Sequence, residues 1–293
     1  MNEPLTARDR RWGLFPALHG GRFAATLRAA PLTTAGAALL LFLVAFSWLG
    51  PLVHPVSPYT LHPHRIFLAP SWAHPLGTDD LGRSFLARMM HGGQPSLGVA
   101  MLGTLIAVVL GLLYGMSSGL SPAWLDKVLM RLLDAILALP TLVLMIFFAA
   151  LVRLSPLSLI LLLGLVSWPG LARIARNEVL AYKNRDYVLA ARQFGAGTGY
   201  LARTHLLRSM LPIVLVNATF TVADLILTLA GLSFLGLGIQ PPAPSWGGLL
   251  GNGSNLAIIG TWWLILFPGL AIVLAILAMN MMGQGVLNRL EGR

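Results

Sequence analysis

Cysteine is absent from this chain of 293 residues. A disulfide framework, a thiolate metal site and a cysteine nucleophile are therefore excluded. Charged residues are also scarce, at 10% of the chain, whereas a soluble domain carries about a quarter. Because hydrophobic residues reach 56%, much of the surface must face something other than water.

Lysine occurs only twice, as Lys127 and Lys183, which follow Asp126 and Tyr182. A phosphate-binding loop needs Gly-Lys-Ser or Gly-Lys-Thr, so no nucleotide site is assigned to this chain. A membrane-embedded enzyme would need a cluster such as His-Glu-x-x-His or a Ser/Lys pair inside a span, and the sequence has neither. We therefore expect a protein without catalytic residues.

Six hydrophobic stretches are long enough to cross a bilayer as helices. A hydrocarbon core of about 30 Å needs roughly 20 apolar residues, and lipid forces such segments to be helical. The predicted spans are residues 32–53, 97–119, 130–152, 156–172, 211–236 and 261–283. Pro140, Pro169 and Pro268 should bend or end their helices. The fold class is thus all-α, a polytopic membrane protein with six transmembrane helices.

The basic residues indicate the orientation, because loops rich in Lys and Arg stay in the cytoplasm. With both termini inside, 16 basic residues are cytoplasmic and 4 are outside. The net charge of +10 is thus topological and does not indicate a nucleic-acid partner. The expected organisation is a cytoplasmic segment 1–31, a first span 32–53, a periplasmic segment 54–96, a five-helix core 97–283 and a cytoplasmic tail 284–293.

Two aspartates lie within the predicted spans. Asp134 has Arg131 one turn earlier, which predicts an i,i+3 ion pair. Asp224 lies near the middle of the fifth span, where an unpaired carboxylate is costly. It could face a wet interface between subunits or contact the transported substrate. The alternative function is an ion-coupled carrier that works without an ATPase. Such a carrier would need more buried ionisable groups than this chain has.

The inner loop, residues 173–210, reads as helix, turn, helix, with a break in Gly195-Ala-Gly-Thr-Gly. Its small residues suit close approach to a groove on another protein, and a solvated basic loop is the other interpretation. Within this loop, YVLAARQFGA at residues 187–196 resembles the EAA loop of permeases of binding-protein-dependent ABC importers. In that family the loop docks into the ATPase subunit as a coupling helix. Leu189 replaces the glutamate, whereas Ala190, Ala191 and Gly195 match.

Three further segments resemble the second, C-type permease of the peptide/nickel branch of that family. They are LGTDDLGR at 76–83, AGLSFLGLG at 230–238 and PPAPSWG at 241–247. The chain departs from the family at Arg208, where a proline is usual after His205, and at Ser84, where an aspartate is frequent. The short tail also lacks the usual ending. These departures weaken any transfer of cargo from the commonest peptide-transporting members.

The resemblance implies an ABC importer type I permease-like fold in the bacterial inner membrane. It implies half of a translocation path for peptides, nickel or metal chelates delivered by a periplasmic or lipid-anchored substrate-binding protein. The other implied partners are a second permease, which is a different chain, and two ATP-binding subunits that hold ATP and Mg. Our candidates for residues that line this path are Asp224 and Ser233. The ATPase-coupling residues are Leu189, Ala190, Ala191, Arg192, Gly195, Ala196 and His205.

The outer segment carries four histidines, at positions 54, 62, 64 and 74, with no fixed spacing, so we expect no metal site there. Asp79, Asp80 and Arg83 should hold this segment through turn capping and ion pairs. Trp246, Trp262 and Trp263 suit the aromatic belt at the outer membrane interface.

Overall fold

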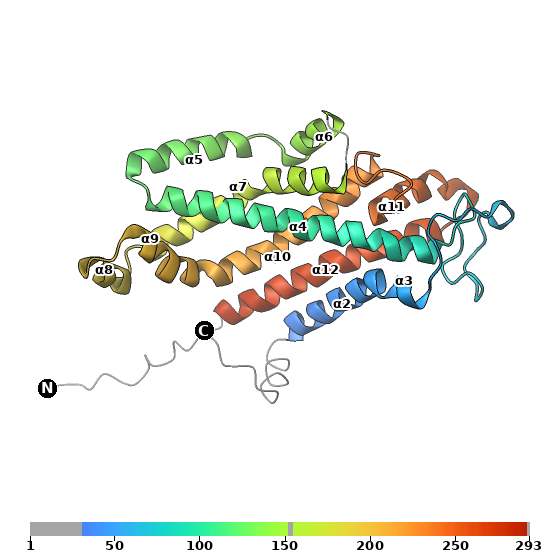
Figure 1. Ribbon diagram of the computed structural model, residues 1–293, viewed down its shortest axis with the longest axis horizontal. Coiled ribbons are helices and arrows are strands. Elements are labelled where there is room, and N and C mark those ends of the chain that lie inside the picture. Colours follow the sequence, from blue (N-terminus) through green and yellow to red (C-terminus); the bar gives the residue numbers. More distant parts are fainter. Residues whose placement is uncertain (1–30, 152–154, 292–293) are drawn as a thin grey trace.

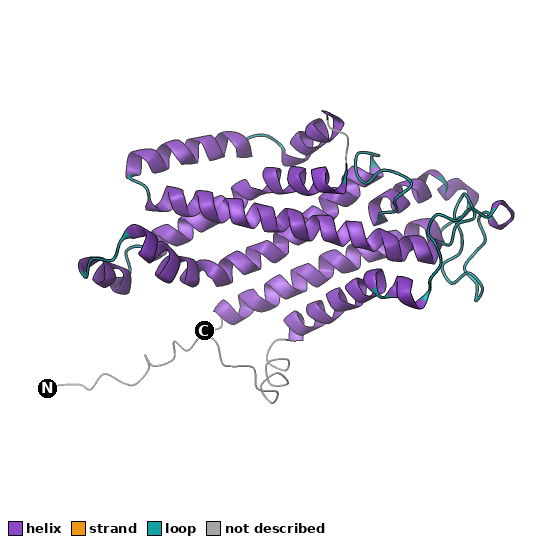
Figure 2. Cartoon of the chain, viewed as in Figure 1, coloured by secondary structure: helices purple, strands orange, loops and turns teal. Residues whose placement is uncertain are grey.

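The computed structural model describes residues 31–151 and 155–291, and this part of the chain is helical with loops and without strands (Figure 2). Long antiparallel helices form one elongated bundle (Figure 1). The α-helices are α2 (Pro31–Trp48), α3 (Gly50–Val53), α4 (Phe85–Leu120), α5 (Ala123–Leu137), α6 (Thr141–Leu151), α7 (Pro156–Tyr182), α8 (Asp186–Gln193), α9 (Thr198–Tyr200), α10 (Leu207–Phe234), α11 (Trp246–Asn255) and α12 (Trp263–Glu291). The short 3₁₀ or π elements are η1 (Pro63–Arg65), η2 (Leu201–Leu206) and η3 (Ala257–Ile259).

Within the part of the chain that the structure describes, five helical segments are long and apolar enough to cross a membrane, and there are six if α5 and α6, bent by 75° at their junction, count as one span. This confirms the all-α polytopic fold with up to six spans and shows that the helix of the predicted third span is interrupted between Leu137 and Thr141. Pro140 lies in the break, as predicted, since proline offers no backbone N–H to continue a helix. Pro169 and Pro268, in contrast, lie inside α7 and α12 without ending them.

The helix that contains the predicted second span, 97–119, begins well before it, because α4 starts at Phe85. The loop of the outer segment therefore ends at Ser84, whose hydroxyl accepts a hydrogen bond from the Ala87 amide and caps the helix. Polar residues in the first turns of α4 hid this start. They are paired inside the protein: Gln94 donates to the Ser47 carbonyl at 2.9 Å, and the Ser96 hydroxyl accepts from the Trp246 amide at 3.0 Å.

Helices of the neighbouring spans extend into the predicted inner loop, 173–210. Helix α7 continues to Tyr182, and from Thr198 the chain is helical to Phe234, so residues 183–197 with α8 form the connection. Likewise α12 continues to Glu291 and takes in most of the predicted tail. Hydropathy marks where a helix is apolar, whereas these helices extend beyond their apolar parts.

Helices α4 and α7 pack at close range through small residues. Gly111, Gly115 and Gly119 recur every fourth position of α4, so they lie on one face. A Cβ atom at Gly115 would lie 2.7 Å from Cβ of Ala175 and would also meet the Ala172 carbonyl. Small residues at such a stripe let helix backbones approach closely in membranes.

The aromatic-belt prediction was wrong for two of the three tryptophans. Trp246 is fully buried, and its indole N–H donates to the Met89 carbonyl at 3.0 Å. Trp263 is also buried and donates to the Thr78 carbonyl at 3.3 Å. Only Trp262 of the three is exposed. The indole N–H groups of the two buried tryptophans, Trp246 and Trp263, thus both donate to backbone carbonyls, as a buried indole requires.

Candidate functional site

Helix α8 lies at one end of the bundle, beside the end of α7 and the start of α10 (Figure 1). Val188 anchors it, with 1% of its surface exposed, in a cluster with Ala175 and Val179 of α7 and Leu206 and Met210 from the chain that follows. Helix α8 is therefore packed against the bundle through one side and is not a solvated loop.

The opposite side of α8 is open. Leu189, Ala190 and Arg192 are exposed, and Phe194, just after the last helical residue, is 92% exposed. Ala191 and Ala196 face inward and pack partly against the Val188 cluster. The predicted coupling residues thus divide into an outward group and a supporting group.

Gly195 ends α8 with a positive φ of 87°, the left-handed conformation that favours glycine. The Gly195 amide donates to the Arg192 carbonyl, and the Ala196 amide donates to the Ala191 carbonyl, each at 3.0 Å. A six-to-one bond around a left-handed residue is the Schellman ending of a helix. A Cβ atom at Gly195 would meet nothing within 4 Å, so the constraint is the backbone conformation and not space.

His205 lies within the π-helical turn η2, between two tyrosine rings. Its ring centroid is 5.9 Å from that of Tyr187 on α8 and 5.8 Å from that of Tyr200. The histidine is half-buried. Through its contact with Tyr187 it links α8 to the helical segment that leads into the fifth span. Among the predicted coupling residues, His205 therefore packs behind α8 and does not belong to the exposed side.

Ion pairs hold the helices behind α8. Arg176 donates to both carboxylate oxygens of Asp126, at 2.7 and 2.5 Å, and the Ser118 hydroxyl donates to the same carboxylate at 2.6 Å. Asp134 pairs with Arg173 of α7 at 2.5 Å, so the predicted pair with Arg131 was wrong. Asp134 thus pairs with Arg173 on the neighbouring helix and not with Arg131 on its own. The pairs Asp134–Arg173 and Asp126–Arg176 both connect α5 to α7.

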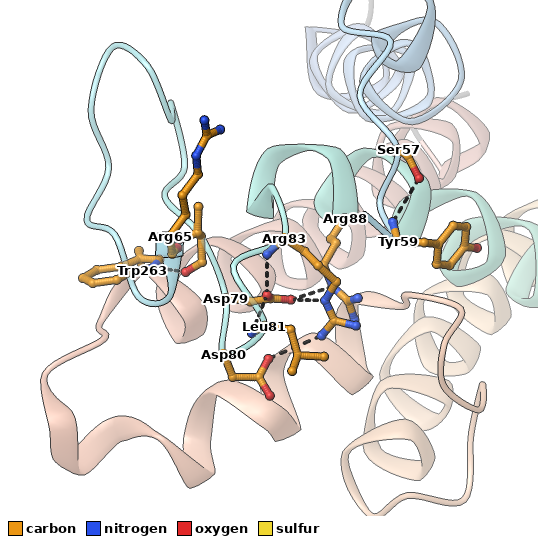
Figure 3. A network of polar contacts seen from close by, with 10 residues as sticks. Ser57, Tyr59, Arg65, Asp79, Asp80, Leu81, Arg83, Arg88 and Trp263 are labelled. Carbon is orange, nitrogen blue, oxygen red and sulfur yellow. Dashed lines mark hydrogen bonds and ion pairs between the residues drawn. The ribbon is translucent and has the colours of Figure 1, made fainter. Parts of the chain in front are cut away.

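At the opposite end of the bundle, one buried carboxylate organises the outer segment (Figure 3). Asp79 accepts hydrogen bonds from the amides of Leu81 and Arg83 and from Arg83 Nε at 2.7 Å. Arg88 Nε lies 3.3 Å from the same carboxylate, and Asp80 pairs with Arg83 at the surface. The predicted turn capping and ion pairs of Asp79, Asp80 and Arg83 are confirmed.

The outer histidines do not come together with other ligands. Within residues 31–151 and 155–291, no group of three or more His, Asp or Glu side chains could hold a metal ion. His74 is half-buried, and its amide donates to the Ser71 carbonyl at 3.0 Å in a local turn.

Asp224 and Ser233 lie on opposite sides of the fifth span. Nine residues of α-helix are two and a half turns, so the two side chains point in opposite directions. Asp224 is exposed, whereas Ser233 is 7% exposed and packs against Gly238. The structure therefore does not bring these two predicted path residues to one surface.

Comparison with known proteins places these features in a family. Residues 107–293 match the family described as binding-protein-dependent transport system inner membrane component. The chain belongs to this family. It is a permease subunit of a binding-protein-dependent ABC importer, a membership that does not support the ion-coupled carrier.

Relatives of the permease cover most of its length. A putative peptide permease of Brucella suis is 39% identical over 244 residues, which are 83% of this chain and 81% of the relative. A di/tripeptide transport system permease of Pseudomonas aeruginosa is 36% identical over 263 residues, 87% and 86% of the two chains. A probable D,D-dipeptide transport system permease of Escherichia coli is 33% identical over 273 residues, 93% and 91% of the two chains.

Sequence reasoning missed the most exposed side chain of the permease's α8 region, Phe194, and the buried Arg88. Arg88 lies in a stretch that was predicted as loop, so its position in the first turn of α4, and hence its burial, could not be predicted.

Proposed function

We propose that this permease imports peptides and that α8 transmits the ATPase cycle to the membrane helices. The observation that carries the proposal is the arrangement of α8: an exposed side with Leu189, Arg192 and Phe194, and a buried anchor, Val188, on α7 and α10. A force applied to the exposed side would reach two spans directly. ATP and Mg would bind to separate subunits and not to this chain.

The charge distribution supports a cytoplasmic location for α8. The segments at its end of the bundle are α5, the end of α7, α8, η2, the start of α10 and the end of α12 (Figure 1). With their connections they carry ten of the described basic residues: Lys127, Arg131, Arg173, Arg176, Lys183, Arg185, Arg192, Arg203, Arg208 and Arg289. The outer segment and the start of α4, at the other end, carry three, Arg65, Arg83 and Arg88. Because positive loops remain inside, the outer segment and α11 would face the substrate-binding protein, and both termini would be cytoplasmic.

Peptides are the proposed cargo because the relatives above carry peptide-transport names. A second permease would complete the path, and two ATP-binding subunits would drive it. Alternating closure of the ATPase pair would switch the path between inward-open and outward-open states. Asp224 is the residue of this chain proposed to face that path.

The test is uptake by cells that lack the gene, with and without a plasmid copy. Labelled dipeptides and oligopeptides are compared with radioactive nickel, free and chelated. Gene-dependent uptake of peptides alone is the expected result. Gene-dependent uptake of nickel alone would contradict the peptide cargo while leaving the importer function intact.

A further inference from the structure

The outer half of α10 has a face that no other described element covers. Asp224, Leu227, Phe234 and Leu235 are exposed on it, and a Cβ atom at Gly231 would meet nothing within 4 Å. The opposite side of the same helix is buried in the core through Val222, Leu225, Ile226, Leu229 and Leu232. This half of α10 is therefore one wall of the bundle.

Asp224 lies deep along this wall. It is ten residues before Phe234, where α10 ends, which at 1.5 Å per residue is about 15 Å along the axis. The hydrocarbon core is about 30 Å thick, so the carboxylate is near the middle of the membrane. Among the described residues, the salt bridges involve Asp79, Asp80, Asp126 and Asp134 and leave Asp224 without a basic partner. A carboxylate at this depth faces water or a cation in the assembled importer.

The surroundings of Asp224 are rich in hydrogen-bond acceptors. Thr221 and Thr228, three residues before and four after, share its side of the helix. The Thr221 hydroxyl donates to the Asn217 carbonyl at 2.9 Å, which leaves its lone pairs free to accept. A primary ammonium has three donors and no acceptor, and so complements a carboxylate beside hydroxyl groups.

We propose that Asp224 binds the ammonium group of the cargo as it crosses the middle of the membrane. This inference rests on the proposed function, because it requires α10 to line the path. The α-ammonium of a peptide and the ammonium of a lysine side chain share this chemistry. The contact is a passing one, since cargo must also leave it.

Thiol labelling tests the inference directly, because the chain has no cysteine of its own. Thr228→Cys is introduced into the assembled importer in membrane vesicles. Its labelling by an aqueous methanethiosulfonate bearing an ammonium is compared with labelling by one bearing a sulfonate. A preference for the ammonium reagent of about tenfold or more is expected, the size of one charge-assisted contact. With Asp224→Asn added, that preference should fall to the value for a small thiol in solution.

Two further variants keep this test decisive. Leu227→Cys, also exposed beside Asp224, replaces Thr228→Cys if that variant does not assemble. Leu215→Cys is the matched control, since Leu215 is 55% exposed but lies two and a half turns from Asp224, on the opposite side. Because it is about 13 Å along the axis from the carboxylate, it should show no preference for the ammonium reagent over the sulfonate reagent. Equal labelling by the two reagents beside Asp224, or no labelling there, would overturn the proposal.

Uptake by the Asp224→Asn variant identifies the source of the ammonium. Lower uptake of both dialanine and dilysine indicates the α-ammonium, and lower uptake of dilysine alone indicates the side chain. Asp224→Glu should restore uptake. Unchanged uptake, or loss of the partner permease on copurification, would overturn the proposal, the latter by placing Asp224 in the subunit interface. Absence of peptide uptake by the wild type would instead contradict the proposed function, and the labelling result would stand separately.

Discussion

Asp79 concentrates several interactions of the outer segment in one buried carboxylate. It receives two backbone amides and lies beside two guanidinium groups, those of Arg83 and Arg88. All three charged side chains are nearly buried, whereas Asp80 is 45% exposed. Removing one charge from such a buried group leaves the others uncompensated, which costs far more than losing a surface pair.

Asp79→Asn should therefore destabilise the permease by about 3–5 kcal/mol, because two buried guanidinium groups lose their counter-charge. Asp80→Asn, the matched control, should cost at most about 1 kcal/mol, since its ion pair is partly in water. Thermal unfolding of the detergent-solubilised protein measures both. Equal unfolding temperatures for the two variants would contradict the account.

Sequence patterns at single residues were informative where the chemistry is local. The pairing of Asp79 with Arg83 follows from turn chemistry over four residues, and it was predictable. The partner of Asp134 was not, because Arg173 is distant in the chain and only the packing of α5 on α7 brings it close. The burial of Trp246 depends likewise on a helix, α4, whose start was hidden by polar residues.

Helix α8 presents an aromatic side chain at its end with almost no contact to its own subunit. Aromatic residues that fill a pocket on a partner often dominate the binding energy of an interface. Phe194 is 92% exposed, and the helix below it is fixed by Val188. Helix α8 is thus held to the bundle by Val188 and leaves the Phe194 ring open to a partner.

Phe194→Ala should weaken association with the ATP-binding subunits by about tenfold or more, the loss expected for an aromatic anchor. The stability of the permease should not change, since the ring makes little contact within the chain. Phe148→Ala on α6, at 43% exposure, is the matched control and should leave the association intact. Copurification of the ATP-binding subunit in mild detergent is the measurement, and equal recovery for both variants would count against α8 as the docking element.

The contact between α4 and α7 depends on the absence of side chains. Gly115→Leu should force the two helices apart, because its side chain would overlap Ala172 and Ala175, and such overpacking costs about 1–3 kcal/mol or more. Gly98→Leu on the same helix should be tolerated, since nothing lies within 4 Å of its Cβ position. The yield of monodisperse permease separates the two. A normal yield of the Gly115 variant would contradict the close packing.

For the whole molecule, hydropathy predicted the helical class and up to six spans. Hydropathy did not predict the lengths of α4, α7 and α10, because the more polar turns at their ends carry no hydrophobic signal. The break in the third span was partly predictable from Pro140. The opposite directions of Asp224 and Ser233 follow from their nine-residue spacing, a relation that only matters once the packing of α10 is known.

The central claim is that α8 couples ATP hydrolysis to movement of peptide through this permease. Gly195 gives the most direct test, because its positive φ fixes the end of α8 without touching any neighbour. Valine there opposes the left-handed conformation by about 1–2 kcal/mol and so redirects the exposed side of α8. Gly197, with φ of −69° and open space around it, accepts valine and serves as the control.

The measurement is peptide uptake and ATP hydrolysis, recorded together in vesicles containing the complete importer. For Gly195→Val the account predicts continued ATP hydrolysis with uptake reduced about tenfold, the effect of a strain near 1.4 kcal/mol. Gly197→Val should transport normally. Uptake by Gly195→Val at the wild-type ratio of peptide to ATP would contradict the role of α8.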